Sequence, residues 1–214
     1  MTRYLRPEVF AVTIADDVAV LDLSSDRYLC LTGAVTDPPG PIDWDRLDPS
    51  SALVRRLAEA GLLFDRFVPV DRATPPRPIR SVLHDGGPDR LHPHDLMHAM
   101  RALVDVRRAL KRPGLSPLLA AEPRCSVQTD TPQGAPEQAA RGFARILPWL
   151  PIDGACLVRS ALLFRFLQRR GLKADWVFGV RLWPFAAHCW IQHGEVCLND
   201  DAERLVPYTP IFRR

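Results

Sequence analysis

The chain has 214 residues, of which 47% are apolar and 25% are charged, which is typical of a folded globular protein and not of a disordered one. Its 28 basic and 25 acidic residues give a formal net charge of +3, too small by itself to indicate nucleic-acid binding. No apolar run approaches the roughly 18 residues of a membrane-spanning helix, and the N-terminus lacks the apolar stretch of a signal peptide. We therefore expect a cytoplasmic protein with neither nucleic-acid nor membrane partners.

Near the N-terminus, three segments rich in β-forming residues are separated by polar turns. The three predicted strands are 9–14, 18–23 and 28–31. Ser50 or Ser51 can cap a following helix that ends at Gly61. Three strands followed by about two helices predict a small winged-helix-like binding module over residues 1–66, without a cluster of catalytic residue types.

Prolines crowd the segment 67–93, which also contains two adjacent glycines. Because proline removes a backbone donor and fixes φ, no regular element is expected at that density. We interpret 67–93 as a linker between the N-terminal module and a second domain over residues 94–214.

In the second domain, helical patterns precede strand patterns. Helices are predicted at about 95–110, 136–147 and 156–170, and strands at 174–183, 187–192 and 195–199. The third helix is almost entirely apolar and ends at Gly171, so we expect it to be buried on most sides. The last two strands form a hairpin around His193 and Gly194. This order predicts an α+β fold with helices packed on an antiparallel sheet.

Cys156 stands at the predicted start of the buried helix, with Asp153 as a candidate N-cap. The positive end of a helix favours a thiolate and lowers the pKa of a thiol. Taken alone, a free cysteine is more often a buried structural residue. Five cysteines in a reducing compartment do not suggest a disulfide framework, which leaves a reactive thiol, a metal ligand or a buried residue.

Two further residues favour the reactive thiol. His188 lies in a predicted strand and Asp200 ends the next one. In thiol acyl chemistry a histidine takes the thiol proton and a carboxylate or amide orients the histidine. A three-residue hairpin loop would place His188 opposite Asp200, whereas a two-residue loop would place it opposite Asn199, so both stay candidates, with Asp200 ranked first.

The residues around this triad carry a resemblance. The segments concerned are 156–160, 169–174, 179–181, 184–190, 199–200 and 208–211. Over about residues 149–212 the chain resembles the B protein of lasso peptide biosynthesis, a transglutaminase-like cysteine protease of the microcin-maturation type. The resemblance implies a transglutaminase/papain-like fold and a catalytic triad of Cys156, His188 and Asp200. At position 189 the family often has alanine, and Cys189 adds a second thiol beside the histidine.

The N-terminal module resembles a PqqD-like precursor recognition element, in which a leader peptide adds as a strand beside the third strand and packs on the last helix. That mode is β-augmentation, with affinity from backbone pairing. The resemblance implies leader-peptide contacts at Tyr28, Leu29, Cys30, Leu31, Leu53, Arg56 and Leu57. The segment 37–41 departs from the family's helical pattern. The chain is similar to a fused form of two proteins that are separate in many relatives.

Together these resemblances imply a cysteine endopeptidase that removes the leader of a ribosomally synthesised lasso precursor peptide through a Cys156 thioester. The core peptide would pass to an asparagine-synthetase-like lasso cyclase. No cofactor is expected in this chain, because neither lysine lies in a P-loop motif. ATP, if maturation requires it, would bind at the partner cyclase.

Three other functions remain open for the same residues. A transglutaminase-type acyl transferase would pass the acyl group to an amine instead of water. A non-catalytic peptide-binding adaptor would keep the triad inert. A zinc site built from His188, Cys189, His193 and Cys197 fits poorly, because no C-x-x-C pair exists and because Cys189, His193 and Cys197 are expected to point away from His188 in their strands. We therefore expect no metal.

Two more residues are candidates for shaping a substrate pocket. Arg159 follows Cys156 on the same helix, and Trp190 follows His188 on the same strand. The alternative roles are a solvated helix charge for Arg159 and sheet packing for Trp190. The backbone N–H of Cys156 is the first candidate for an oxyanion donor.

Overall fold

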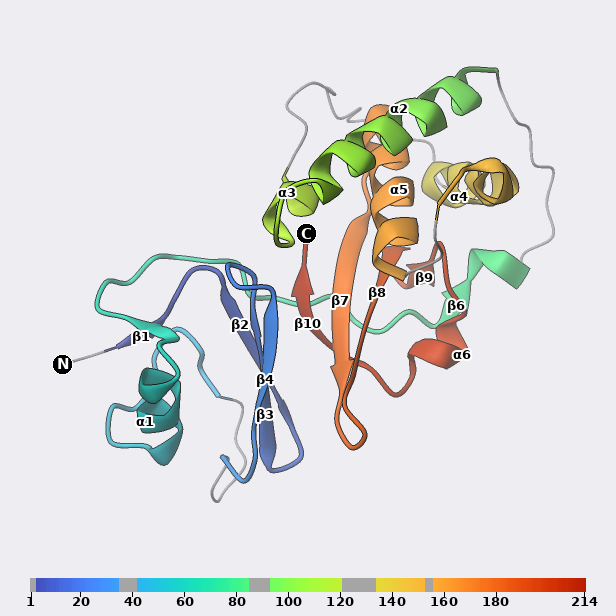
Figure 1. Cartoon of the computed structure of the whole chain (residues 1–214). Coiled ribbons are helices and arrows are strands. Elements are labelled where there is room, and N and C mark those ends of the chain that lie inside the picture. The colour runs from blue at the N-terminus through green and yellow to red at the C-terminus, as the bar shows by residue number, and fades with distance from the viewer. Residues whose placement is uncertain (1–2, 35–41, 85–92, 121–133, 153–155) are drawn as a thin grey trace.

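The computed structural model describes residues 3–34, 42–84, 93–120, 134–152 and 156–214 (Figure 1). The predicted N-cap Asp153, the segment 37–41 and Cys125 lie outside these described residues.

The three predicted N-terminal strands form an antiparallel meander in the order β2-β3-β4. Their bounds are β2 Val9–Ile14, β3 Asp17–Asp22 and β4 Arg27–Leu31. One α-helix follows in the described part of this region, α1 (Ala52–Glu59), whose N-cap Ser51 accepts a hydrogen bond from the backbone N–H of Val54. A second, two-stranded sheet pairs β1 (Tyr4–Leu5) with β5 (Leu63–Phe64). The strands are thus confirmed, whereas the winged-helix-like arrangement stays a prediction.

The meander has two buried faces. Val18 and Val20 of β3 face α1 and pack in one core cluster with Leu57. Ala19 and Leu21, which alternate with them, pack in a different cluster that belongs mainly to the C-terminal helices and sheet. Across this second face the rings of Phe10 and Phe212 lie 4.6 Å apart, centroid to centroid. The N-terminal module therefore shares a hydrophobic core with the rest of the chain.

The Pro-rich segment contributes regular structure, so the expectation that none would form is wrong for residues 80–84. Strand β6 (Arg80–Ser81) pairs in parallel with β9 (Val196–Cys197), and the 3-10 helix η1 (Val82–His84) follows. The Ser81 hydroxyl also donates to the backbone carbonyl of Asp200 at 2.6 Å. Proline elsewhere in the segment does not prevent this pairing because Arg80 and Ser81 both retain their backbone N–H.

The C-terminal part is a layer of helices on a five-stranded sheet, as the α+β prediction requires (Figure 1). The helices are α2 Pro93–Leu110, α3 Ser116–Leu119, α4 Ala135–Ile146, η2 Leu147–Trp149, α5 Cys156–Arg169 and α6 Ala202–Leu205. The sheet order is β10-β7-β8-β9-β6, with β7 Asp175–Arg181, β8 Ala186–His193 and β10 Thr209–Arg213, antiparallel except for the β6–β9 pair. Helix α5 packs on β8 and, as expected from its composition, is buried along most of its length.

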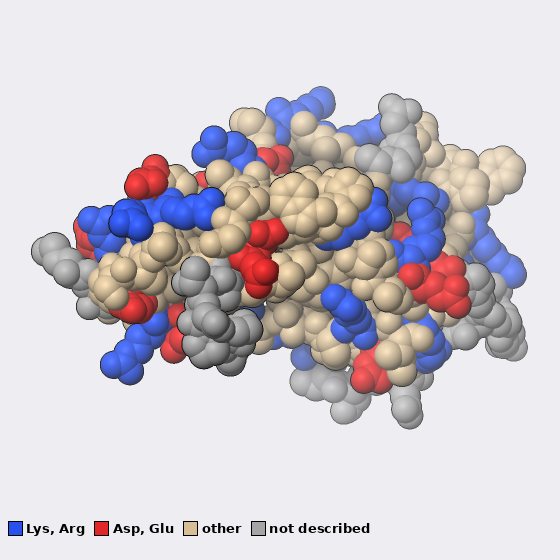
Figure 2. Space-filling model, turned by 90° about the horizontal axis from the view of Figure 1, so that it is seen from below, with Lys and Arg blue, Asp and Glu red and all other residues tan. Residues whose placement is uncertain are grey.

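The tip of the β7–β8 hairpin reaches the N-terminal meander. The indole N–H of Trp183 donates to Asp17 Oδ2 at 2.7 Å, and the ring of Phe185 lies 5.7 Å from that of Tyr28, centroid to centroid. On the face of the molecule seen in Figure 2, acidic and basic side chains are interspersed with uncharged surface. Among the described residues, no helix combines the length and the apolar character that crossing a membrane demands.

Candidate active site

His188 and Asp200 lie next to each other near the N-terminal end of β8, where β9 no longer pairs with this strand. The Nε2 atom of His188 lies 2.7 Å from Asp200 Oδ2, and both side chains are mostly buried. The hairpin register that pairs them was predicted wrongly in both alternatives. The turn is Gly194–Glu195, so Gln192 faces Cys197, and the strand ends there. Asp200 approaches His188 from a bend after β9 and not from a paired strand position.

Cys156, the first residue of α5, hydrogen-bonds through its thiol group to the side chains of Cys189 and His188. These bonds, and a further one from the backbone N–H of Cys189, lower the pKa of Cys156 to about 4, against the opposing effect of burial. Because the Nε2 atom of His188 faces Asp200, its Nδ1 atom is the one available to Cys156. Cys156 is therefore a thiolate near neutral pH.

The same contacts raise the pKa of both partners of Cys156, His188 and Cys189. The hydrogen bond that His188 donates to Asp200, followed by the one that it donates to Cys156, raises the pKa of His188 to about 9. The Cys189 thiol is nearly inaccessible, and its hydrogen bond to Cys156 and its burial raise its pKa. Between about pH 4 and pH 9 the site thus holds a thiolate beside an imidazolium, with Cys189 as a neutral donor to the thiolate sulfur.

The short length of β9 creates this site. Beyond Cys197, one more backbone hydrogen bond forms, from the Leu198 N–H to the Ile191 carbonyl at 2.8 Å. After it, β8 has no strand partner on that side among the described residues, and side chains replace the partner. Asn199 Oδ1 accepts from the backbone N–H of Ile191 at 2.8 Å, and the Asn199 amide donates to the Ser160 hydroxyl, also at 2.8 Å. Ser160 in turn donates to the backbone carbonyl of Cys189 at 3.1 Å. Asn199 therefore positions the strand, while Asp200 orients the histidine.

Two aromatic rings pack against His188 on its own face of the sheet. The His188 ring stacks on Trp190 at 6.4 Å and lies 5.4 Å from the ring of Tyr208, centroid to centroid. Trp190 is fully buried and donates to Gln192 Oε1, so it is a packing residue of the sheet. A Cβ atom at Gly179, opposite His188, would lie 2.7 Å from the Trp190 ring, which explains the glycine in this strand.

The predicted leader-contact residues divide between two faces of the meander. Leu31, Leu53 and Leu57 are buried in the core beneath α1, so their side chains support the module and are not available to a ligand. Leu29 packs on the same side but keeps partial exposure. Arg56 is partly exposed and donates to the carbonyl of Thr32 at 2.6 Å.

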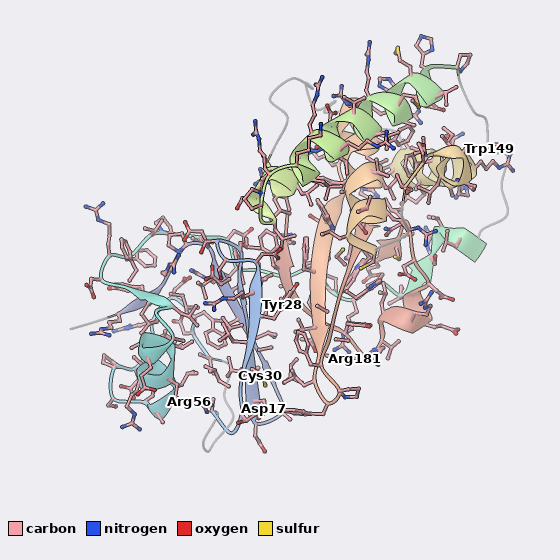
Figure 3. All side chains as sticks on the ribbon, viewed as in Figure 1. Asp17, Tyr28, Cys30, Arg56, Trp149 and Arg181 are labelled. Carbon is pink, nitrogen blue, oxygen red and sulfur yellow. The ribbon has the colours of Figure 1, made fainter. Side chains whose placement is uncertain are left out.

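Tyr28 and Cys30 face the other way, toward the C-terminal domain. Cys30 is partly exposed on β4, the edge strand of the meander. Tyr28 packs on the core cluster that also contains Cys156, and Figure 3 shows it between the meander and the β7–β8 hairpin. Burial, together with the nearby thiols of Cys189 and Cys156, raises the pKa of the Tyr28 hydroxyl. No local sequence pattern indicated that this residue would approach the triad.

No group of three or more metal-ligating side chains occurs among the described residues. Cys197 packs beside Trp190, on the same face as His188, contrary to the prediction that it points away. It is fully buried and has a raised pKa owing to burial. The Nδ1 atom of His193 lies instead 3.1 Å from Oε1 of Glu137 on α4.

The arrangement of a helix-start cysteine, a strand histidine and a following carboxylate agrees with the comparison to known families. The family model described as the transglutaminase-like superfamily matches residues 100–213, more than half of the chain, including all three triad positions. No curated protein and no solved structure matches significantly. This superfamily typically has the activity of a cysteine peptidase or an acyltransferase with a Cys-His-Asp triad. The chain therefore belongs to the transglutaminase-like superfamily.

Proposed function

We propose that this protein is a cysteine endopeptidase that binds the leader of a ribosomally synthesised lasso precursor peptide and cleaves it off. The observation that carries the proposal is the shared core of the triad and the meander. Tyr28 of the edge strand β4 and Cys156 pack on one cluster. The thiols of Cys189 and Cys156 also lie near enough to Tyr28 to contribute to the raised pKa of its hydroxyl, so a peptide held along β4 would pass near the thiolate.

The chemistry follows from the charge state of the triad. The Cys156 thiolate attacks the scissile carbonyl carbon, and the resulting oxyanion is stabilised by backbone donors such as the Cys156 N–H. The imidazolium of His188 gives its proton to the departing amine, which leaves with the core peptide. Water, deprotonated by neutral His188, then attacks the thioester and releases the leader as a carboxylate, which restores the thiolate.

An extended peptide suits the N-terminal module because β4 has an unpaired edge in the described part of the chain. Main-chain pairing along such an edge supplies affinity that depends little on side chains. This agrees with the burial of Leu31, Leu53 and Leu57, which leaves the β4 backbone and the more accessible Tyr28, Leu29, Cys30 and Arg56 as the candidate contacts.

The released core peptide carries a new amino terminus, which an asparagine-synthetase-like lasso cyclase would use for ring closure. We propose no cofactor for this chain, and ATP consumption would belong to that partner. The lasso assignment rests on the resemblance of residues 149–212 and of the N-terminal module to the corresponding families.

Incubation of the full chain with a lasso precursor peptide, followed by mass spectrometry, tests the proposal. We expect two fragments whose masses sum to that of the precursor plus one water. A run with added glycine methyl ester separates hydrolysis from acyl transfer. If the main product is the leader joined to glycine methyl ester, the protein is an acyltransferase. An intact precursor would refute both activities.

Cys30 offers a native reporter of leader docking. In the full-length Cys156→Ala variant, saturating precursor peptide should slow N-ethylmaleimide labelling of Cys30 by at least about tenfold, because an added strand would cover the edge of β4. The core peptide without its leader is the matched control and should give no protection. Equal Cys30 labelling with and without the full precursor would place the leader elsewhere.

A further inference from the structure

A cavity of about 410 Å³ lies next to the first turns of α5. Its walls come from α4, η1, η2, α5 and the bend after β9. The residues that shape it most are apolar: Leu83, Phe143, Leu147, Ile152, Leu163 and Leu198. Arg159 and Asn199 are the polar residues among its described lining. This volume and composition are those of a ligand pocket that receives one or two apolar groups.

The cavity shares its framework with the triad. Arg159 lies one helical turn after Cys156, so the two residues are neighbours on the same side of α5. Asn199 directly precedes Asp200 and bonds to Ser160, which lies four residues after Cys156. Neighbours at such helix spacings have Cβ atoms roughly 5–6 Å apart, about the length of one side chain. A group attached to the carbon that Cys156 attacks can therefore reach the cavity.

The meander and α4, which lines the cavity, lie on different sides of α5 (Figure 1). Figure 3 shows Tyr28 and Trp149 on opposite sides of α5, and Trp149 belongs to the η2 segment whose neighbours Leu147 and Leu150 line the cavity. A chain that leaves β4 at Tyr28 and crosses the N-terminal end of α5 continues toward this side.

We propose that the cavity is a substrate pocket that receives an apolar, branched or aromatic side chain of the peptide held at Cys156, with Arg159 at its polar rim. This inference rests on the proposed function for the nature of the substrate. It also gives Arg159 a role distinct from a solvated helix charge, because its exposed guanidinium stands where the peptide backbone or a carboxylate would pass.

Alkylation of Cys156 tests the pocket without a natural substrate. The probes are N-(2-phenylethyl)iodoacetamide and N-(2-hydroxyethyl)iodoacetamide, which share one reactive group but carry an apolar or a polar tail. Rates at Cys156 are read by mass spectrometry on the full chain. We expect the phenyl probe to react at least about tenfold faster, because its ring would enter the cavity.

A cavity-filling variant provides the comparison. Ala144 lines the cavity from an exposed position of α4, so Ala144→Trp fills it without disturbing the core. The phenyl-to-hydroxyethyl rate ratio should fall to about one in this variant. Gln138→Trp, also exposed on α4 but away from the lining, should keep the wild-type ratio.

A wild-type ratio near one, or a high ratio that survives in Ala144→Trp, would overturn the pocket. Measuring the ratio at pH 6 and at pH 8.5 separates this result from the fate of the catalytic proposal. Slow labelling at pH 6 by both probes contradicts the activated thiolate. At pH 8.5 even an ordinary thiol reacts, so the ratio there still reports on the cavity.

Discussion

Replacement of Cys156 by alanine is expected to reduce precursor cleavage by at least about 10⁴-fold, because removal of a catalytic nucleophile leaves only the binding and oxyanion contributions. Binding of the precursor should persist, since the β4 edge lies outside the substitution. Mass spectrometry gives the cleavage rate, and fluorescence anisotropy of a labelled precursor gives the affinity.

The neighbouring thiol supplies the matched control. Cys189 contacts Cys156 as a neutral donor, so Cys189→Ser keeps a hydroxyl that can donate to the thiolate and should retain measurable cleavage. Cleavage that survives in Cys156→Ala but is lost in Cys189→Ser would assign the nucleophile to position 189. Cleavage that survives in both variants would mean that neither thiol is used.

The local pattern of the C-terminal domain could be predicted from the sequence because each element has a strong local signal. Helix α5 is a mostly apolar segment that ends at Arg169, shortly before Gly171, which adopts a positive φ of 71°. The triad could be proposed because a helix-start cysteine, a strand histidine and a carboxylate after the next strand are the residue types that thiol acyl chemistry needs, and because the segments around them carry the family resemblance.

The register of the β8–β9 hairpin could not be predicted, because turn composition alone did not distinguish His193–Gly194 from Gly194–Glu195. This error in register does not decide which residue meets His188, because β9 ends at Cys197 and Asp200 lies outside the paired strand residues. The roles of Ser160 and Asn199 depend on where β9 stops, and no local pattern encodes that point.

The sequence does contain a signal for the core that the meander shares with the C-terminal domain, but the interpretation of 67–93 as a linker obscured it. Residues 18–21 of β3 are continuously apolar, and such a run is expected of a strand buried on both faces. A module standing apart on a linker would have one polar face. For the same reason, an isolated fragment 1–66 would expose Phe10, Ala19 and Leu21, so tests of leader binding belong on the full chain.

Replacement of His188 by alanine is expected to change the pH dependence of iodoacetamide labelling at Cys156. In the wild-type chain the rate should be nearly constant from pH 5 to pH 8, because the pKa of Cys156 is about 4 and the thiolate is already formed. Loss of the imidazolium removes an opposite charge, which raises the thiol pKa by roughly 1–3 units. The rate should then climb with pH over that range, as read by mass spectrometry of each cysteine.

Cys30 serves as the internal reference, because burial raises its pKa and its labelling should rise with pH in every variant. Asp200→Asn should shift the Cys156 profile less than His188→Ala does, since the histidine remains. Loss of the Asp200 carboxylate lowers the pKa of His188 below its wild-type value of about 9. As the pH rises, His188 therefore loses its proton, and with it the ion pair to Cys156, at a lower pH than in the wild-type chain. Asn199→Ala leaves the Ile191 N–H without its partner and should cost about 1–3 kcal/mol of stability without moving the profile.

These outcomes distinguish an activated thiolate from a buried structural cysteine. If wild-type Cys156 labels with the same pH dependence as Cys30, the imidazolium does not lower its pKa and the peptidase mechanism fails. If Asn199→Ala moves the profile and Asp200→Asn does not, the histidine is oriented by the amide. Because Asp200 Oδ2 lies 2.7 Å from His188 Nε2 whereas Asn199 is committed to Ile191 and Ser160, we expect the carboxylate to govern the profile.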